Sequence, residues 1–354
     1  MKLIADSSAP GPVREKFLPT LHGFRGFLAV WVMTYHSSPS GLSWFKVSSY
    51  GFSAVDVFFM LSGYVLMHNH FSTLDWHASA ILQFYRSRWW RTYPLYFFCV
   101  LLSIVFMMSL STPPSIRQIA VAVLLLEGWA LKGLGVNTPV WSLGVEWCGY
   151  LAFPAIVFCL RSVSRWVALI LLLIVVLAEL ISLHILAKDN LDVIAGYPAI
   201  ARMSGGFLAG CVLWLVHSKF WQRNSGDDTL FVVSVALTAL TFLFLPPSFG
   251  IVPLLGVLHC VARPGKKTYR IFATPFAIWL GRISFSLYLS HLLILKLVKQ
   301  FLPFEGRHGL DTVVAVFLAL GVAALICAVI EEPTRRLSHR IAAAKARRAI
   351  AHLE

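Results

Sequence analysis

The segment Leu21–His36, LHGFRGFLAVWVMTYH, decides the fold because it combines an apolar run with two isolated polar side chains. Arg25 and His36 are eleven residues apart, so on a helix they share one face and lie about 16 Å apart along the axis. A charge inside hydrocarbon is costly, and an intramembrane Arg or His usually lines a protected interior or a functional site. The same spacing also suits an Arg that reaches the interface and a His at the far end of the helix, so both interpretations stay open.

The composition is that of a membrane protein and not of a soluble domain. Hydrophobic residues make up 58% of the 354 residues and charged residues only 13%, whereas soluble domains carry about 25% charged residues. The mean hydropathy is +0.75. The net charge of +14 comes from short basic clusters between apolar runs, a pattern that sets membrane topology and contacts anionic lipids instead of nucleic acid.

The six cysteines lie within or beside apolar runs and form neither a CxxC pair nor a Cys/His metal spacing. We therefore expect free, packed thiols, with neither disulfides nor a metal site. The first residues contain no apolar core of signal-peptide length, so we expect residues 1–20 to form a short cytoplasmic tail.

Ten apolar runs are long enough, or nearly so, to span a membrane. They begin near residues 21, 50, 92, 139, 166, 198, 229, 250, 273 and 310. A further candidate, 116–134, is interrupted by Glu127, Gly128 and Lys132. The predicted fold class is therefore all-α, a polytopic membrane helix bundle of about ten transmembrane helices.

The basic clusters favour ten helices over eleven. If 116–134 does not cross, six clusters and 20 of the 30 Lys and Arg residues fall on one side of the membrane, against seven on the other. If it crosses, this bias collapses. We therefore expect a re-entrant or interfacial segment at 116–134 and both termini in the cytoplasm. The basic tail, 333–354, either lies on anionic lipid as an amphipathic helix or is a simple stop-transfer and anchoring tail, and we favour the second interpretation.

Three polar groups share one depth in this topology. His36 lies at the outer end of the first helix, and Asp56 and Glu146 each lie about two turns from the outer face. An ionised Asp at this depth needs a partner, for which His36 or an Arg is the natural candidate. Two carboxylates and one imidazole suit general base catalysis on a hydroxyl, and equally a proton relay in a transporter.

Two arginines, Arg86 and Arg88, follow the second predicted helix and precede Trp89 and Trp90. Two guanidiniums beside stacking aromatics favour a phosphate-bearing ligand that enters from the cytosol. An ordinary basic cluster at the membrane surface is the alternative.

Other polar residues have simpler interpretations. Glu179 and Arg202 lie in consecutive predicted helices, and we expect them to form a structural ion pair. His291 falls at mid-membrane, where it either joins the site or hydrogen-bonds a neighbouring helix, and we favour the second interpretation.

Six stretches, in order along nearly the whole chain, resemble motifs of the acyltransferase-3 family of bacterial integral-membrane O-acyltransferases. They are LHGFRGFLAVWVMTYH, with its Arg, ten residues and His, then GFSAVDVFFMLSGYVL, RSRWWRTYPLY, VWSLGVEWCGYLAFP, GRISFSLYLSHLLIL and EEPTRRL. The departures are small: His22 stands where the family commonly has Asp, Ala54 where Gly is frequent and Ser290 where Trp is frequent.

The resemblance implies an acyltransferase domain at 21–332 that needs no permanently bound cofactor. It implies transfer of an acyl group, usually acetyl, from cytosolic acyl-coenzyme A to a hydroxyl of a glycan or glycolipid, such as exopolysaccharide, at the outer face of the bacterial inner membrane. Partners in surface-polysaccharide assembly fit the same role. By motif position it implies eight site residues. They are the general base His36 with its motif partner Arg25, Glu146 and Asp56 to orient the His or the acceptor, Arg86 and Arg88 for coenzyme A phosphates, and Trp141 and Ser142 for substrate.

Two other classes of function stay open. A transporter or flippase of a lipid-linked glycan would use His36, Asp56 and Glu146 as a proton relay, although the inverted repeats of many transporters are not apparent. A non-catalytic assembly subunit would tolerate loss of His36. The sequence leaves the acceptor, the acyl group and the existence of a covalent acyl-histidine open.

Overall fold

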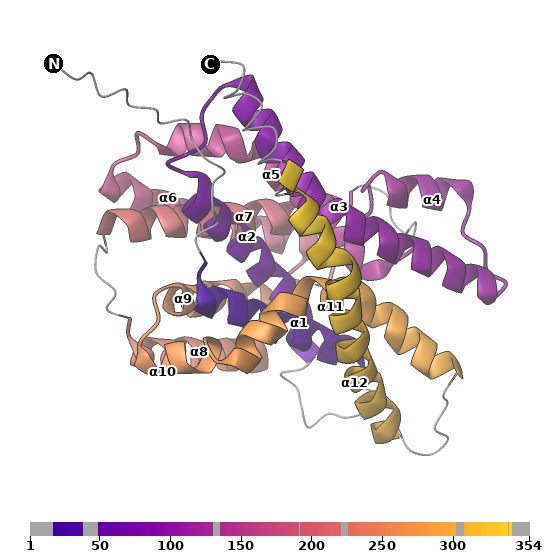
Figure 1. Cartoon of the computed structure of the whole chain (residues 1–354). Coiled ribbons are helices and arrows are strands. Elements are labelled where there is room, and N and C mark those ends of the chain that lie inside the picture. The colour runs from indigo at the N-terminus through magenta and orange to yellow at the C-terminus, as the bar shows by residue number, and fades with distance from the viewer. Residues whose placement is uncertain are drawn as a thin grey trace.

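The structure is a computed structural model that describes most of the chain as helices (Figure 1). The described residues are 17–37, 49–129, 135–190, 192–220, 226–301, 308–338 and 340–341, without the side chains of 308–311. No β-strand occurs among them, which confirms the expected all-α class.

Twelve α-helices and three shorter helices follow one another in the described residues. They are α1 (Pro19–Ser37), α2 (Ala54–His70), α3 (Ala78–Ser109), α4 (Ile116–Val123), η2 (Thr138–Val140), α5 (Trp141–Leu160), α6 (Arg165–Ala187), α7 (Tyr197–Phe220), α8 (Asp228–Phe244), η3 (Pro247–Gly250), α9 (Ile251–Ala262), α10 (Lys266–Phe272), α11 (Pro275–Phe301), α12 (His308–Ile326) and η4 (Cys327–Glu331). The elements η2 and η3 are 3₁₀-helices, and η4 is a π-helix.

The number of membrane-spanning helices differs from the sequence prediction. Within the described residues, seven helices are long and apolar enough to cross a membrane, or eight if α9 and α10, which meet at a 91° bend, form one span. The expected ten are therefore not confirmed. Helix α8 has only 17 residues, and polar side chains such as His22 and Arg25 lower the mean hydropathy of α1. The fold is that of a multi-pass membrane protein.

Long-range contacts define the two ends of the bundle, which we call the Arg25 end and the His36 end. At the His36 end, the Thr312 hydroxyl donates to the carbonyl of Ser37 at 3.3 Å, and the Ser248 hydroxyl donates to Asp189 at 2.6 Å. At the Arg25 end, Arg161 after α5 donates to the carbonyl of Leu74 after α2. Successive long helices therefore alternate in direction between these two ends.

Two helix pairs with close backbone contact build the core that holds the site. Helix α1 packs most extensively against α11, and α2 against α7. A Cβ on Gly26 of α1 would lie only 2.7 Å from the backbone nitrogen of Gly281 on α11. A Cβ on Gly63 of α2 would collide with the carbonyl oxygen of Phe207 on α7. Small residues let helices approach this closely, and Figure 1 shows α1 and α11 side by side near the centre of the bundle.

The segment at 116–134 forms no continuous spanning helix in its described part. Helix α4 has eight residues, a length of about 12 Å. The chain then turns, with φ values of 60° at Leu125 and 86° at Gly128. Residues 130–134 lie outside the described residues. This geometry agrees with the expected re-entrant or interfacial segment.

Two helix boundaries differ from the predicted ones. Helix α3 begins at Ala78, well before the expected start near 92, and its 32 residues carry the arginines of the RSRWWR stretch. The last span continues to Ser338 through Pro333. The π-helix η4 immediately before Pro333 widens the turn in which a proline ring would otherwise crowd the preceding carbonyls. Residues 1–16 and 342–354 of the predicted tails lie outside the described residues.

Candidate active site

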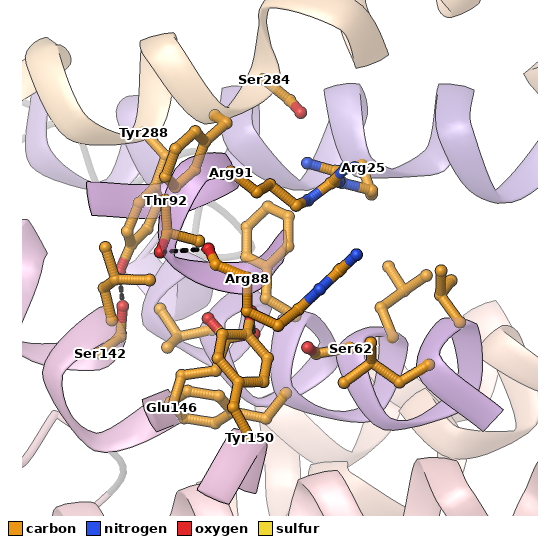
Figure 2. Close-up of a pocket in the computed structure, with 18 of the residues that line it drawn as sticks. Arg25, Ser62, Arg88, Arg91, Thr92, Ser142, Glu146, Tyr150, Ser284 and Tyr288 are labelled. Carbon is orange, nitrogen blue, oxygen red and sulfur yellow. Dashed lines mark hydrogen bonds between the residues drawn. The ribbon is translucent and has the colours of Figure 1, made fainter. Parts of the chain in front are cut away.

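Three arginine side chains line a cavity of about 140 Å³ between α1, α2, α3, α5 and α11, which we call the arginine cavity. Arg25 comes from α1, and Arg88 and Arg91 come from α3. Figure 2 shows the guanidinium ends of Arg25 and Arg91 close to each other, with Arg88 reaching toward the same space. Glu146 and Glu331 also line the cavity. Planar guanidiniums gathered around one hollow suit an anionic ligand with several oxygen acceptors, such as a phosphate.

Arg25 differs from Arg88 and Arg91 in its polar contacts. Within the described residues it forms neither a hydrogen bond nor an ion pair, although it lies inside the bundle. A guanidinium has five N–H donors and can bond several oxygens of an anionic ligand. The cavity therefore presents unused donors to a ligand.

Helix phase separates Arg86 from Arg88. Arg88 is only 8% exposed and lines the cavity, whereas Arg86 is exposed and does not. On α3, Arg86 and Arg88 point about 160° apart, while Arg88 and Arg91 point about 60° apart. The structure therefore joins Arg88 to Arg91, which was not named as a candidate from the sequence. The spacing of three residues on a helix is the signal that would have found it.

Glu146 faces the arginine cavity and not His36. It lies on α5, where its Oε1 accepts a hydrogen bond from the Tyr150 hydroxyl at 2.7 Å. Figure 2 shows Glu146 and Tyr150 beside Arg88 at one wall of this cavity. The predicted layer of His36, Asp56 and Glu146 is therefore not formed, because Glu146 lines the arginine cavity and His36 does not.

A second cavity, of about 260 Å³, lies toward the His36 end, and we call it the histidine cavity. Its lining includes His36 and Tyr35 from α1, Trp141 from the start of α5, and Asp192 from the connection before α7. Asp192 was not a candidate in the sequence analysis, because only the fold of this connection brings it near His36. The cavity combines aromatic surfaces, a carboxylate and an imidazole.

Val55 and Tyr288 line both cavities and therefore form the boundary between them. The Tyr288 hydroxyl, on α11, hydrogen-bonds the Ser142 hydroxyl at 2.7 Å, and Figure 2 shows this bond at the wall of the arginine cavity. Trp141 lines the histidine cavity and Ser142 the arginine cavity, so two consecutive residues of α5 face different hollows. Tyr288, three residues before His291, was not proposed from the sequence.

Asp56 is held by Arg202 and not by His36. Its two carboxylate oxygens accept hydrogen bonds from Nε and Nη2 of Arg202 at 2.8 and 2.9 Å. Both side chains are buried, with exposed fractions of 0% and 1%. The Arg202 guanidinium also lies over the Trp141 ring at 5.2 Å. This pair fixes α2 against α7 beside the histidine cavity.

The prediction that Glu179 forms an ion pair with Arg202 is wrong, because the Arg202 guanidinium bonds the Asp56 carboxylate instead. Glu179 is 2% exposed, and within the described residues neither of its carboxylate oxygens has a hydrogen-bond partner. A buried carboxyl group without donors favours its neutral form. Both acids face α7, since Glu179 packs against Gly205, and the helix count alone did not distinguish which of them bonds Arg202.

His36 has no carboxylate partner in the described part of the chain. Its Nδ1 lies 3.1 Å from the carbonyl oxygen of Val32 and 3.1 Å from Nε2 of His291. The predicted contact between His36 and Asp56 or Glu146 is therefore absent, because both acids have other partners. His291 contacts His36 itself and so joins the candidate site, which is the interpretation that the sequence analysis did not favour.

The loop before α5 is fixed by a buried acid. Oε1 of Glu127 accepts a hydrogen bond from the backbone N–H of Val136 at 2.9 Å. Asn137 donates through Nδ2 to the carbonyl of Leu289 at 3.0 Å, which ties this loop to α11. Glu127 lies outside the membrane-spanning segments, and burial raises its pKa to about 7 although backbone N–H groups of Val136 and Asn137 lower it. These bonds position the first turn of α5.

No group of three or more His, Cys, Asp or Glu side chains within the described ranges is arranged to hold a metal ion. The six cysteines have free thiols, of which four are buried, whereas that of Cys159 is exposed and not packed as expected. The side chains that line the two cavities include arginines, hydroxyls, carboxyls and the imidazole of His36.

Comparison with known protein families identifies the class to which this membrane helix bundle belongs. Residues 18–332 match the model of the acyltransferase-3 family, which is described as an acyltransferase domain. The chain therefore belongs to this family, and the resemblance inferred from its motifs is confirmed.

Similar curated proteins bear acyltransferase names. Acyltransferase MdmB of Streptomyces mycarofaciens is 26% identical over 373 residues, which cover 93% of this chain and 94% of that protein. O-acetyltransferase OatA of Staphylococcus aureus is 23% identical over 363 residues, with 91% of this chain and 58% of OatA covered. Peptidoglycan O-acetyltransferase OatA of Listeria monocytogenes is 25% identical over 362 residues, 91% of this chain and 56% of that protein. The chain thus spans little more than half of the OatA proteins. No solved structure matches it.

Proposed function

We propose that this protein transfers an acyl group, most simply acetyl, from acyl-coenzyme A to a hydroxyl of a glycan or glycolipid. One observation carries the proposal: a cavity lined by three arginines and a cavity lined by a histidine meet at Val55 and Tyr288. A transferase needs separate sites for an anionic donor and a neutral hydroxyl acceptor, with a short path between them. The two cavities fit these two needs.

The donor is assigned to the arginine cavity. Arg25, Arg88 and Arg91 would contact the phosphates of coenzyme A, with the pantetheine arm directed toward Ser142 and Tyr288. The excess of basic residues at the Arg25 end favours the cytosol for this end and for both termini. The His36 end then faces the extracytoplasmic side of a bacterial inner membrane.

The acceptor is assigned to the histidine cavity. Tyr35 and Trp141 offer flat apolar surfaces, and Asp192 offers acceptors for hydroxyl protons. This combination suits a carbohydrate, whose ring faces are apolar and whose edges carry hydroxyls. A surface glycan, a glycolipid or a glycosylated small molecule would satisfy the same contacts.

His36 acts as the general base in the proposed reaction. It takes the proton of the acceptor hydroxyl while the hydroxyl oxygen attacks the thioester carbonyl carbon. The C–S bond then breaks, the ester remains on the acceptor, and the proton held by His36 passes to the departing thiolate, which gives coenzyme A. General base assistance of this kind contributes about 10²–10⁴-fold in rate. The Tyr288 hydroxyl would donate to the carbonyl oxygen as its negative charge develops.

The relatives support transfer to oxygen. Two of them are named as O-acetyltransferases, and one of these names specifies peptidoglycan. Because this chain covers only 58% and 56% of those proteins, their complete activity is not transferred to it. MdmB, which it covers almost fully, is named simply as an acyltransferase.

The alternative of a proton-coupled transporter receives less support. Its relay would run through His36, Asp56 and Glu146, but Asp56 is bonded to Arg202 through both oxygens and Glu146 lines the other cavity. No described contact links either acid to His36.

Calorimetry with acetyl-coenzyme A and purified protein tests the donor assignment. We expect saturable binding that weakens in Arg25→Gln and is abolished by free coenzyme A in excess. Absence of binding to the wild-type protein would remove the proposed donor. Incubation with radiolabelled acetyl-coenzyme A without acceptor, followed by denaturation, distinguishes direct transfer from an acyl-histidine, since only the latter leaves label on the protein.

A further inference from the structure

Among the described residues, His291 is a fully buried histidine that contacts His36. It lies on α11 with an exposed fraction of 0%, and its ring centroid is 5.0 Å from that of His36, with 43° between the ring planes. The distance between Nε2 of His291 and Nδ1 of His36 is 3.1 Å. Neither the family match nor the named relatives assign a role to this contact.

The proton of His291 is located by its backbone partners. Its Nδ1 lies 2.8 Å from the carbonyl oxygen of Tyr288 and 3.1 Å from that of Leu287. Carbonyl oxygens only accept, so Nδ1 of His291 must carry the proton. A second proton on Nε2 would make a fully buried imidazolium, and no carboxylate of the described residues contacts it. Nε2 of His291 is therefore an acceptor.

This acceptor fixes the proton on His36. Nδ1 of His36 faces two acceptors, Nε2 of His291 and the carbonyl oxygen of Val32, each at 3.1 Å. If Nδ1 carried a lone pair, it would face these two acceptors without a proton, which is unfavourable. With the proton on Nδ1, both contacts are satisfied, and Nε2 of neutral His36 holds the lone pair. No described residue hydrogen-bonds that Nε2.

We propose that His291 is a positioning residue that holds His36 in the Nδ1–H tautomer, so that Nε2 of His36 is the atom that takes the acceptor proton. This inference rests on the proposed function only for the identity of the proton donor. The chain of bonds runs from the α11 backbone through His291 to His36, and no acid takes part. It performs the orienting task that the sequence analysis assigned to Asp56 or Glu146, since neither acid reaches His36.

The same chain connects His36 to the boundary between the cavities. The Tyr288 carbonyl accepts from His291, and the Tyr288 side chain lines both cavities. A single turn of α11 therefore positions both the base and the hydroxyl pair of Tyr288 and Ser142. Movement of this turn would change both groups together.

Nitrogen NMR of ¹⁵N-histidine-labelled protein in detergent tests the tautomer directly. The His36 signals are identified by their loss in His36→Gln. We expect wild-type His36 to be protonated at Nδ1 and unprotonated at Nε2 near pH 8. In His291→Phe, which fills the space without an acceptor, we expect the Nε2–H tautomer to rise several-fold. His291→Gln, whose side-chain oxygen accepts, should restore most of the wild-type signal.

Kinetics provide the second readout. We expect His291→Phe to lower kcat about 10-fold, the effect of one lost hydrogen bond, with KM for acetyl-coenzyme A unchanged, and His291→Gln to recover most of the rate. Ser290→Ala on the same helix, which removes a hydroxyl bonded only to the Ser286 carbonyl, is the control and should keep the wild-type rate.

Two results would overturn the inference: wild-type His36 protonated at Nε2, or a tautomer that is the same in wild type and His291→Phe. The first is measured on the wild-type protein and so does not depend on folding of a variant. If no acyl transfer is found in any variant, the proposed function fails, whereas the NMR result still decides the tautomer.

Discussion

The hydroxyls of Tyr288 and Ser142 lie 2.7 Å apart at the place where the arginine cavity and the histidine cavity meet. Tyr288 reaches this place from α11 and Ser142 from the first turn of α5. The bond joins two segments that are 146 residues apart in the sequence. An acyl group that moves between the cavities would pass this hydroxyl pair.

Removal of the Tyr288 hydroxyl should slow transfer without weakening donor binding. Tyr288→Phe keeps the ring that separates the cavities but removes the donor to the carbonyl oxygen. The loss of one such donor typically costs about 10²–10³-fold in kcat. Initial rates of acetyl transfer should show this loss with KM for acetyl-coenzyme A nearly unchanged. A large rise in KM with normal kcat would assign Tyr288 to donor binding instead.

The arginines of α3 should differ in their effect on donor binding, because only those on one face of the helix line the cavity. Arg88→Gln and Arg91→Gln should each weaken acetyl-coenzyme A binding about 10-fold or more, because charge-assisted bonds to phosphate are worth about 1.5–3 kcal/mol. Arg86→Gln is the matched control, since Arg86 is exposed and outside the cavity. Calorimetry measures all three. Equal effects of Arg86 and Arg88 would show that the phosphates bind outside the cavity.

We expect the loss of the Asp56 charge to lower the free energy of unfolding, because Asp56 is the counter-charge of buried Arg202. Asp56→Asn leaves Arg202 buried without its counter-charge, and breaking a buried pair costs about 3–5 kcal/mol. Thermal unfolding in detergent should show a large fall in Tm. Arg336→Gln, which breaks a pair whose arginine is 74% exposed, should change stability by less than about 1 kcal/mol.

The double variant Asp56→Leu/Arg202→Met separates the two roles of Asp56. Replacement of both buried charges by apolar side chains should recover much of the lost stability. A stable double variant that still transfers acyl groups would confine Asp56 to structure. A stable Asp56→Asn protein with an unchanged Tm would refute the structural role.

Glu127 should make stability depend on pH near neutrality. Because burial raises its pKa to about 7, from an ordinary value of 4.5, the folded protein binds more protons than the unfolded chain between these values. Stability should therefore fall as pH rises from about 4.5 through 7 and level off above it. Glu127→Gln keeps the acceptor for the Val136 N–H but cannot ionise, so this part of the pH dependence should vanish. Tm values of both proteins at pH 5 and pH 8 provide the comparison, and parallel changes would contradict the account.

The sequence predicted the fold class and the two ends of α1 well, for physical reasons. Apolar runs identify membrane helices because hydrocarbon tolerates few charges, and the helical repeat places Arg25 and His36 on one face at opposite ends. Each of the two now lines its own cavity. The number of spans was less well predicted, because a helix such as α1 carries functional polar groups that lower its hydropathy.

The contacts within the site could not be read from the sequence. Counting residues predicts how deep a side chain lies along its helix. The rotation of the helix about its axis and the helices beside it depend on packing, as where Gly26 lies against Gly281. Asp56 and Glu146 were predicted to share a depth with His36, yet they bond Arg202 and Tyr150. Arg202 bonds Asp56 and not Glu179. The packing of α7 on α2 determines this partner, and the sequence does not show that packing.

The central claim is acyl-coenzyme A-dependent transfer with His36 as the base, and one measurement tests it most directly. Surface glycans and glycolipids are analysed by mass spectrometry from a strain that lacks the gene and carries either the wild-type gene, His36→Gln or an empty vector. We expect an acyl ester that is present with the wild type and reduced at least 100-fold with His36→Gln at equal protein levels. The same amount of ester with His36→Gln as with the wild type would contradict the account.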